Sequence, residues 1–265
     1  MLLSNKVAIV TGSAGGIGRG IATKFATEGA KVAVVDIDLN GANETLEMIK
    51  KDGGEGIAVK ADITSRSELQ AMVDKVIEAY GRIDILVNNA GSLLSIADQD
   101  KKSITLIPED QWDKIVEINL KGCFLTCQLV TPYMLKQGYG KIVNMSSLGA
   151  IHPPTIAPHY NAAKAGIIAL SLDMAAELGP KNITVNVISP GPIRTSFYDP
   201  VVNAMSEADR EARFAAMTKG VPLQRLGTPE DIAGAALFFA SDLSSFVTGV
   251  NLLVAGGMPL APRIH

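Results

Sequence analysis

The sequence predicts an α/β domain in which helices cover both faces of a doubly wound, parallel sheet of seven strands. Two observations predict this fold. Seven short and nearly continuous apolar runs have the composition of strands that are covered on both faces. Longer segments with helical periodicity separate these runs, and regular alternation of strand and helix is typical of right-handed crossovers in an open parallel sheet.

The expected elements alternate along the whole chain. The predicted strands are Lys6–Thr11, Lys31–Asp36, Gly56–Lys60, Ile83–Val87, Lys141–Met145, Ile183–Ile188 and Val250–Val254. The predicted helices are Gly16–Glu28, Asn40–Lys51, Ser65–Tyr80, Glu109–Lys136, Tyr160–Leu178 and Pro229–Ser241. No linker, internal repeat or low-complexity segment interrupts the alternation, so residues 1–265 are expected to form a single domain.

Two connections between the predicted elements are longer than the others. Ser92–Pro108 is polar, and Pro190–Gly227 includes a further predicted helix at Val201–Thr218. Both leave the carboxyl ends of predicted strands, where open α/β sheets bind their ligands. Because long excursions in a compact domain are usually functional lids or disordered loops, we expect a rim loop at residues 92–108 and a substrate lid at about residues 190–227.

Composition and charge exclude several classes of protein. Hydrophobic residues make up 47% of the chain, and the net charge of -3 includes no basic run, which argues against a nucleic-acid surface. No window reaches the roughly 18 apolar residues of a membrane span, and the N-terminus lacks the apolar stretch of a signal peptide. We therefore expect a cytoplasmic protein. Cys123 and Cys127 have neither zinc-site nor disulfide spacing, so reduced, buried thiols and no metal are expected.

A glycine-rich turn, TGSAGGIG, joins the first predicted strand to the first predicted helix and includes Gly12, Gly16 and Gly18. Glycines at this spacing permit a tight turn and a close approach of the backbone to a pyrophosphate, whose charge is stabilised at the helix N-terminus. The turn alone is weak evidence, because a plain strand–helix connection can have the same sequence.

The residue at the end of the second predicted strand strengthens this interpretation. Asp36 stands eighteen positions after Gly18, close to the spacing at which a carboxylate hydrogen-bonds the ribose 2′-hydroxyl of NAD. A 2′-phosphate would face a like charge there, and neither positions 13–15 nor Ile37 supplies a cation. NAD is therefore the predicted cofactor. The alternative is that Asp36 only ends a strand in a solvated turn.

Tyr160 and Lys164 stand four positions apart at the head of a largely apolar predicted helix, so their side chains share one face. A free tyrosine has a pKa near 10, too high for a good base at neutral pH. A cation within about 4–6 Å favours the phenolate. The pair indicates a proton-transfer device, although a surface aromatic residue beside a solvated lysine would have the same spacing.

With these residues in view, the chain resembles the short-chain dehydrogenase/reductase family from about Lys6 to Gly257. TGSAGGIG matches the family's TGxxxGxG turn, and NNAG at positions 88–91 matches its sheet-supporting motif. INL includes Asn119, NMSS ends at Ser147, YNAAK fits YxxxK, and SPGPIRT fits the PG motif. The resemblance implies a Rossmann-type dinucleotide-binding fold, an alcohol dehydrogenase or ketone reductase activity, and a homotetramer.

The resemblance also implies a catalytic set of four residues. Tyr160 would be the acid/base, Lys164 would make its hydroxyl usable and bind the nicotinamide ribose, and Ser147 would stabilise the reacting oxygen. Asn119 would hold a water molecule, and Ser147 is preferred to Ser146 because it stands thirteen positions before Tyr160. The implied cofactor contacts are Gly12, Gly16, Ile17, Gly18, Asp36, Asp62, Ile63, Asn89, Gly91, Tyr160, Lys164, Pro190, Gly191, Ile193 and Thr195.

The expected substrate is a small secondary alcohol or its ketone, because the variable rim is largely apolar. A 3-oxoacyl thioester reductase is the first alternative, but it predicts NADPH, which Asp36 disfavours. A non-catalytic NAD-binding regulator is the second, and it would need no proton path. His152 and His159 lie in a predicted proline-rich loop and are expected to be loop or pocket-wall residues without a catalytic role, and substrate contact by Arg194 stays open. Ala255 departs from the aspartate of many family members.

Overall fold

The computed structural model describes residues 1–93, 104–153, 157–195 and 205–260. Its seven strands form one parallel sheet in the order β3-β2-β1-β4-β5-β6-β7. The strands are β1 (Val7–Thr11), β2 (Lys31–Asp36), β3 (Glu55–Lys60), β4 (Ile85–Asn88), β5 (Gly140–Met145), β6 (Ile183–Pro190) and β7 (Asn251–Val254). The predicted doubly wound fold class is confirmed.

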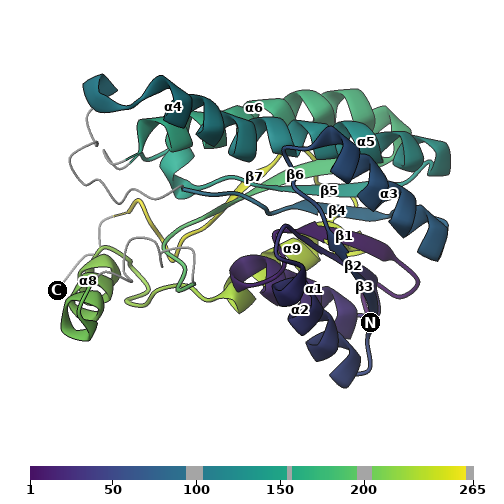
Figure 1. The fold of residues 1–265 in the computed structure, drawn as a ribbon, viewed down its shortest axis with the longest axis horizontal. Coiled ribbons are helices and arrows are strands. Elements are labelled where there is room, and N and C mark those ends of the chain that lie inside the picture. The colour runs from purple at the N-terminus through teal and green to yellow at the C-terminus, as the bar shows by residue number, and fades with distance from the viewer. Residues whose placement is uncertain (94–103, 154–156, 196–204, 261–265) are drawn as a thin grey trace.

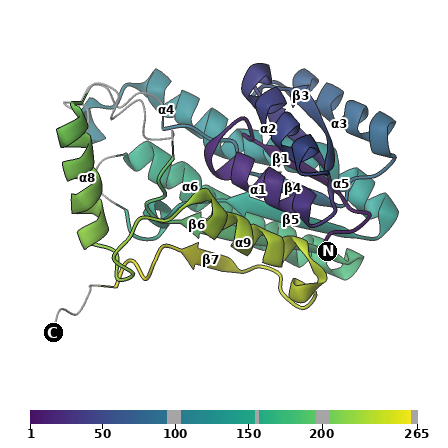
Figure 2. The same cartoon turned by 90° about the horizontal axis from the view of Figure 1, so that it is seen from below.

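The helices lie in two layers, one on each face of the sheet (Figure 1). The first layer contains α3 (Arg66–Tyr80), α4 (Glu109–Val116), α5 (Gly122–Gln137) and α6 (Pro158–Leu178). The second contains α1 (Gly16–Thr27), α2 (Leu39–Lys51) and α9 (Pro229–Ala240), with α1 and α9 packed side by side (Figure 2). A further helix, α8 (Glu207–Lys219), stands apart from both layers.

Each face of the sheet has its own hydrophobic core, because neighbouring strand residues point to opposite faces. Val10 and Val34 pack with Phe25 of α1 under the second layer. Ile9 and Val35 pack with α3 and α5 under the first layer. The predicted buried, reduced thiols of Cys123 and Cys127 are confirmed, and both belong to this first-layer core.

Strand boundaries agree with the predictions to within a few residues, but two helices differ. The predicted helix Glu109–Lys136 is divided, because a π-helical segment, η3 (Glu117–Lys121), separates α4 from α5. The predicted lid helix Val201–Thr218 begins too early. Met205 and Ser206 are described and are not helical, and α8 begins at Glu207. Ser206 caps it by accepting a hydrogen bond from the Asp209 amide. Residues 201–204 lie outside the described residues.

The doubly wound order sets the position of the candidate site. β1 lies between β2 and β4, so the connections from β1 and β4 leave the sheet next to each other, where the winding direction reverses. Open α/β sheets bind ligands at the carboxyl ends of the strands beside this reversal. Among the residues that the structure describes, no helix combines the length and the apolar character needed to cross a bilayer.

Candidate active site

The glycine turn after β1 can be formed only with small residues. Gly12 has a φ of +65°, and a Cβ atom there would lie 2.7 Å from the Ala90 Cα. A Cβ on Gly18 would lie 2.1 Å from the Gly12 carbonyl oxygen, so α1 starts in direct contact with the turn. A Cβ on Gly15 would meet no atom within 4 Å. The turn is thus tightly packed behind and open at Gly15, which fits a pyrophosphate at the N-terminus of α1.

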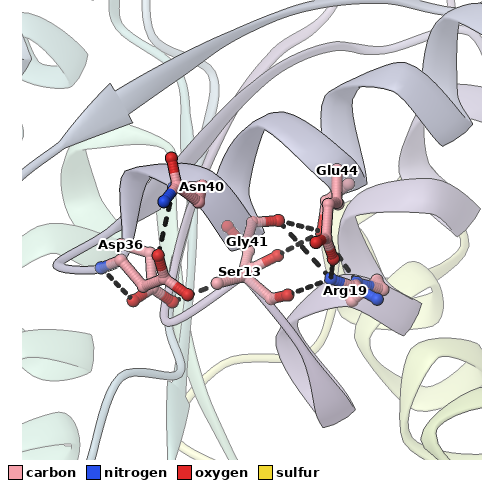
Figure 3. Close-up of polar contacts among 9 residues, drawn as sticks. Ser13, Arg19, Asp36, Asn40, Gly41 and Glu44 are labelled. Carbon is pink, nitrogen blue, oxygen red and sulfur yellow. Dashed lines mark hydrogen bonds and ion pairs between the residues drawn. The ribbon is translucent and has the colours of Figure 1, made fainter.

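Asp36 ends β2 beside this turn and is half-buried. Its carboxylate accepts hydrogen bonds from the Ala14 amide (2.9 Å) and from the Asp38 amide (3.0 Å). Figure 3 shows Asp36 on the opposite side of Ser13 and Gly41 from Arg19. The two amides fix the orientation of the carboxylate, and its remaining lone pairs are left for a further donor.

The other predicted adenosine contacts lie after β3. The Asp62 carboxylate accepts hydrogen bonds from the amide and the hydroxyl of Thr64, both at 2.8 Å. Ile63 packs against Gly122, where an added Cβ would lie 2.9 Å from the Ile63 side chain. Both residues follow a strand next to β2, so they lie at the same sheet edge as Asp36.

Asn89 connects the ends of β1 and β4. Its side-chain amide donates to the carbonyl oxygens of Thr11 (3.0 Å) and Gly12 (2.9 Å), while its backbone amide donates to the Thr11 hydroxyl (3.1 Å). These bonds use the amide nitrogen to hold the glycine turn on the sheet. Asn89 therefore supports the turn, in addition to the backbone contact predicted for it.

Lys164 is the charged residue of the predicted catalytic set, and it is buried. Its side chain is on α6, its exposed fraction is 4%, and its ammonium donates to the Met145 carbonyl oxygen at 3.0 Å. The Nζ atom lies 5.6 Å from the centre of the half-buried Tyr160 ring. Burial lowers the pKa of Lys164 to about 8. The structure thus brings a partly desolvated ammonium next to the aromatic ring predicted as acid/base.

Asn119 lies in the π-helical segment η3 and is buried. Its side-chain amide donates to the carbonyl oxygens of Ile115 (3.1 Å) and Ser92 (2.8 Å), and its side-chain oxygen accepts from the Ser92 amide (3.3 Å). Because the side chain binds the Ile115 carbonyl, it competes with the helix backbone, as π-bulges at functional sites often allow. A Cβ on Gly91 would lie 2.7 Å from the Asn119 Oδ1 and 3.2 Å from the Lys164 Nζ. Gly91, Asn119 and Lys164 therefore lie together.

The two serines after β5 have different surroundings. The Ser146 hydroxyl is buried and donates to the Lys164 carbonyl oxygen at 2.8 Å, which ties β5 to α6. Ser147 is half-buried, and its hydroxyl oxygen accepts from the Gly149 amide at 3.1 Å. That bond leaves the Ser147 proton for another acceptor. Ser146 therefore has a structural hydrogen bond, and Ser147 stays the predicted catalytic serine.

The PG segment lies across the start of α1. Pro190 ends β6, and the Gly191 amide donates to the Val254 carbonyl oxygen at 3.0 Å. Ile193 is buried and forms a bridge with Gly227. A Cβ on Gly16 would lie 3.4 Å from the Thr195 Cβ, so this segment faces the glycine turn. Ile17 contacts the core beneath the turn.

The loop residues are divided between surface and core. His152 is exposed, and Arg194 forms an exposed ion pair with Glu211 at 3.2 Å. The assignment of His159 to a loop is wrong: α6 begins at Pro158, a favourable first helical residue, and His159 is buried within it. Burial lowers the pKa of His159. Neither ring nitrogen has a hydrogen-bond partner in the part of the chain that the structure describes.

Sequence reasoning missed a chain of buried polar contacts below the site. The Asn88 side-chain amide donates to the Asn144 oxygen, and the Asn144 amide donates to the Ser171 hydroxyl, both at 2.9 Å. The Ser171 hydroxyl in turn donates to the Ile167 carbonyl oxygen at 2.7 Å. Polar residues within apolar strands were the available signal, and the chain joins β4 and β5 to the helix of Tyr160 and Lys164.

Comparisons with known proteins agree with this geometry. Residues 12–259 match the family model described as enoyl-(acyl carrier protein) reductase. The chain is 40% identical over 263 residues to the 3-oxoacyl-[acyl-carrier-protein] reductase FabG of Thermotoga maritima, covering 97% of this chain and 99% of that protein. It is 40% identical over 255 residues to the 7alpha-hydroxysteroid dehydrogenase of Escherichia coli strain K12, covering 96% and 94%.

Solved structures give the same result. A 7alpha-hydroxysteroid dehydrogenase complexed with NADH and 7-oxo glycochenodeoxycholic acid superposes with a TM-score of 0.85 and 39% identity, covering 96% of this chain and 94% of that chain. Levodione reductase superposes with a TM-score of 0.88 and 30% identity, covering 96% and 98%. The family match, the sheet order and the grouping of Gly91, Asn119 and Lys164 lead to one conclusion: this chain belongs to the short-chain dehydrogenase/reductase family of nicotinamide-dependent oxidoreductases.

Proposed function

We propose that this protein is an NAD-dependent oxidoreductase that interconverts a small secondary alcohol and the corresponding ketone, with Tyr160 as acid/base. The observation that supports it most is the position of Lys164. A desolvated ammonium lies 5.6 Å from the centre of the Tyr160 ring, and a Cβ atom added to Gly91, which follows β4, would lie 3.2 Å from it. A regulator that only binds a dinucleotide would not need a hydroxyl that exchanges protons beside this ammonium.

The described residues fit a dinucleotide. The open face of the glycine turn at Gly15 and the N-terminus of α1 would bind its pyrophosphate, and Asp36 would accept hydrogen bonds from its adenosine ribose. Asp62 and Ile63 would flank the adenine, while Ile193 and Thr195 would contact the carboxamide. When bound, the nicotinamide ring supplies the hydride acceptor or donor.

The chain's own residues would move the proton. During oxidation the Tyr160 oxygen would take the proton from the substrate hydroxyl, and during reduction it would return that proton to the carbonyl oxygen. The Lys164 ammonium stabilises negative charge on that oxygen. The Ser147 hydroxyl would donate to the reacting oxygen. Asn119 would hold a water molecule that connects Lys164 to solvent.

The carboxylate of Asp36 supports NAD over NADP, because a 2′-phosphate would lie against a like charge. The alternative is a 3-oxoacyl thioester reductase that uses NADPH, in line with the name of the Thermotoga relative. The name of the Escherichia coli relative and the oxosteroid in the solved neighbour favour a cyclic secondary alcohol. We expect the substrate to bind at the rim predicted for residues 92–108 and the lid predicted for about residues 190–227, of which residues 94–103 and 196–204 lie outside the described residues.

We also propose a cytoplasmic homotetramer. Apolar side chains are exposed on and around α9 and β7: Phe238 (37%), Phe246 (fully), Val250 (39%) and Leu253 (39%). Exposed apolar groups of this kind are typical of surfaces covered by another subunit. Sedimentation velocity tests this proposal, and a monomer at micromolar concentration would contradict it.

A substrate panel tests the proposed activity. Secondary alcohols, sugar alcohols, hydroxysteroids and 3-oxoacyl thioesters are assayed with both cofactors by the absorbance of reduced nicotinamide. We expect turnover of an alcohol with NAD, and a loss of about 10²–10⁴-fold in Tyr160→Phe with NADH binding retained. Tyr80→Phe at the end of α3 removes the same hydroxyl away from the site and should keep full activity. Activity confined to thioesters with NADPH, or near-normal turnover by Tyr160→Phe, would refute the proposal.

A further inference from the structure

The peptide unit between Ser13 and Ala14 is hydrogen-bonded on both sides. On one side the Thr45 hydroxyl of α2 donates to the Ser13 carbonyl oxygen at 2.8 Å. On the other side the Ala14 amide donates to the Asp36 carboxylate at 2.9 Å. A trans peptide is planar, with its C=O and N–H pointing in opposite directions. The grip of Thr45 on the carbonyl therefore directs the amide toward Asp36.

Arg19 of α1 holds the next peptide unit and Thr45 itself. Its Nε atom donates to the Thr45 hydroxyl oxygen at 2.9 Å, so the Thr45 proton is directed to carbonyl oxygens, that of Ser13 at 2.8 Å and, more weakly, that of Gly41 at 3.2 Å. Its Nη2 atom donates to the Ala14 carbonyl oxygen and, at 3.4 Å, to that of Gly41. Because one rigid guanidinium binds the turn and α2 together, it fixes their relative position (Figure 3).

The hydrogen bonds at Ser13 and Thr45 are buried, whereas the nearby ion pair between Arg19 and Glu44 is more exposed. Ser13 and Thr45 are completely buried. The Arg19 side chain is 28% exposed, whereas its ionic partner Glu44 is 67% exposed and 3.1 Å away. Exposed ion pairs contribute little, so the bonds from Arg19 to the turn and to Thr45 carry the effect. Glu44→Gln is therefore a matched control that alters the charge pair and spares those bonds.

We propose that Arg19 and Thr45 are positioning residues for dinucleotide binding: from behind the glycine turn they orient the Ala14 amide and so align the Asp36 carboxylate with the adenosine ribose. The inference rests on the proposed function, because it presumes that Asp36 binds that ribose. It assigns a role to two side chains that lie between the glycine turn and α2, behind the proposed ligand site. Loss of either lets the turn rotate and leaves Asp36 with one amide fewer.

Titration of NADH fluorescence tests this without any substrate. A hydrogen bond to a charged group is worth roughly tenfold or more in affinity, so Arg19→Met and Thr45→Val should each raise the Kd for NADH about tenfold. Glu44→Gln should stay within about twofold. In an Asp36→Ala background, Arg19→Met should have less than a twofold effect, because its action through Asp36 is already lost. Thermal unfolding midpoints identify any variant that is not folded at the assay temperature.

The outcomes distinguish the two proposals. If the wild-type protein binds no dinucleotide, the proposed function fails and this inference fails with it. If the wild type binds NADH and a folded Arg19→Met binds it equally well, only the inference is overturned. An equal loss in Glu44→Gln, or the same loss with and without Asp36, would also overturn it, since neither result agrees with orientation of the carboxylate through the turn.

Discussion

Replacing Lys164 by Met should stabilise the folded protein while it removes the proposed cation. Lys164 is 4% exposed, and its ammonium donates to the Met145 carbonyl oxygen. Burial lowers its pKa from 10.5 to about 8. The folded state therefore holds the charged form at a cost that the unfolded state does not have.

The size of the effect follows from the pKa change. A difference of about 2.5 units, at 1.36 kcal/mol each, makes the buried charge cost about 3 kcal/mol at pH 7. Loss of the bond to Met145 offsets about 1 kcal/mol of this gain. Lys164→Met should thus be more stable than the wild type by about 2 kcal/mol at pH 7.

Because burial lowers the pKa of Lys164, the stability difference between the wild type and Lys164→Met should depend on pH. Below about pH 8 the lysine is protonated in both states, and the full cost is present. Between about pH 8 and 10.5 the unfolded state binds more protons than the folded state, so wild-type stability rises relative to Lys164→Met and the variant loses its advantage.

Urea unfolding of both proteins at neutral pH and near pH 10.5 measures this difference. Lys75→Met is the matched control, because Lys75 is exposed and also donates to a backbone carbonyl, that of Ala58 at 3.3 Å. It should change stability little at either pH. A Lys164→Met protein that is less stable than the wild type at pH 7, or a difference that does not vary with pH, would refute the reasoning.

Three further changes test other parts of the structure. Gly18→Ala places a Cβ atom 2.1 Å from the Gly12 carbonyl oxygen, so it should lower stability by about 1–3 kcal/mol and weaken NADH binding; an unchanged unfolding midpoint would contradict this. Burial lowers the pKa of His159, so the unfolded state binds more protons and wild-type stability should fall as pH drops below about 6.5. His159→Leu should remove that acid sensitivity in unfolding experiments at pH 5 and 7. Asp84 is fully buried and accepts two hydrogen bonds from Arg82, at 2.8 and 2.6 Å. Since Arg82 is half-exposed, Asp84→Asn should cost about 1–3 kcal/mol of stability by urea unfolding, and no measurable loss would show that the pair is dispensable.

The sheet could be predicted from the sequence because its strands are buried on both faces. β2 and β5, for example, lie within one residue of their predicted bounds. An apolar run flanked by glycine or polar residues leaves little freedom in where such a strand begins and ends. The pairing of Tyr160 and Lys164 on one face was equally predictable, since helical geometry alone sets it.

The surroundings of the site residues could not be predicted, because they depend on contacts between distant segments. The burial of Lys164 requires Met145 of β5 and Gly91 after β4. The use of Ser146 as a structural donor depends on the position of α6. The burial of His159 was missed because a proline at the first helical position was assigned to a loop.

The division of the predicted helix Glu109–Lys136 also depends on contacts between segments that are distant in the sequence. Local sequence favours one continuous helix through Asn119, and the bonds that open it reach Ser92, which lies 27 positions away in the sequence. A side chain that binds both the Ile115 carbonyl and a distant loop cannot be recognised from periodicity.

The π-helical segment η3 also restricts how this part of the chain can vary in length. An extra residue within η3 advances the backbone by roughly 100° of rotation relative to a uniform α-helix, so η3 sets the direction in which the side chains of α4 point relative to those of α5. Deleting a single residue between Glu117 and Lys121 would restore uniform pitch and swing α4 around its own axis. Asn119 would then lose its contacts with Ser92 and with Gly91 at the same time. We therefore expect that this segment does not tolerate the insertion or deletion of even one residue, whereas a surface loop tolerates insertions and deletions of several residues.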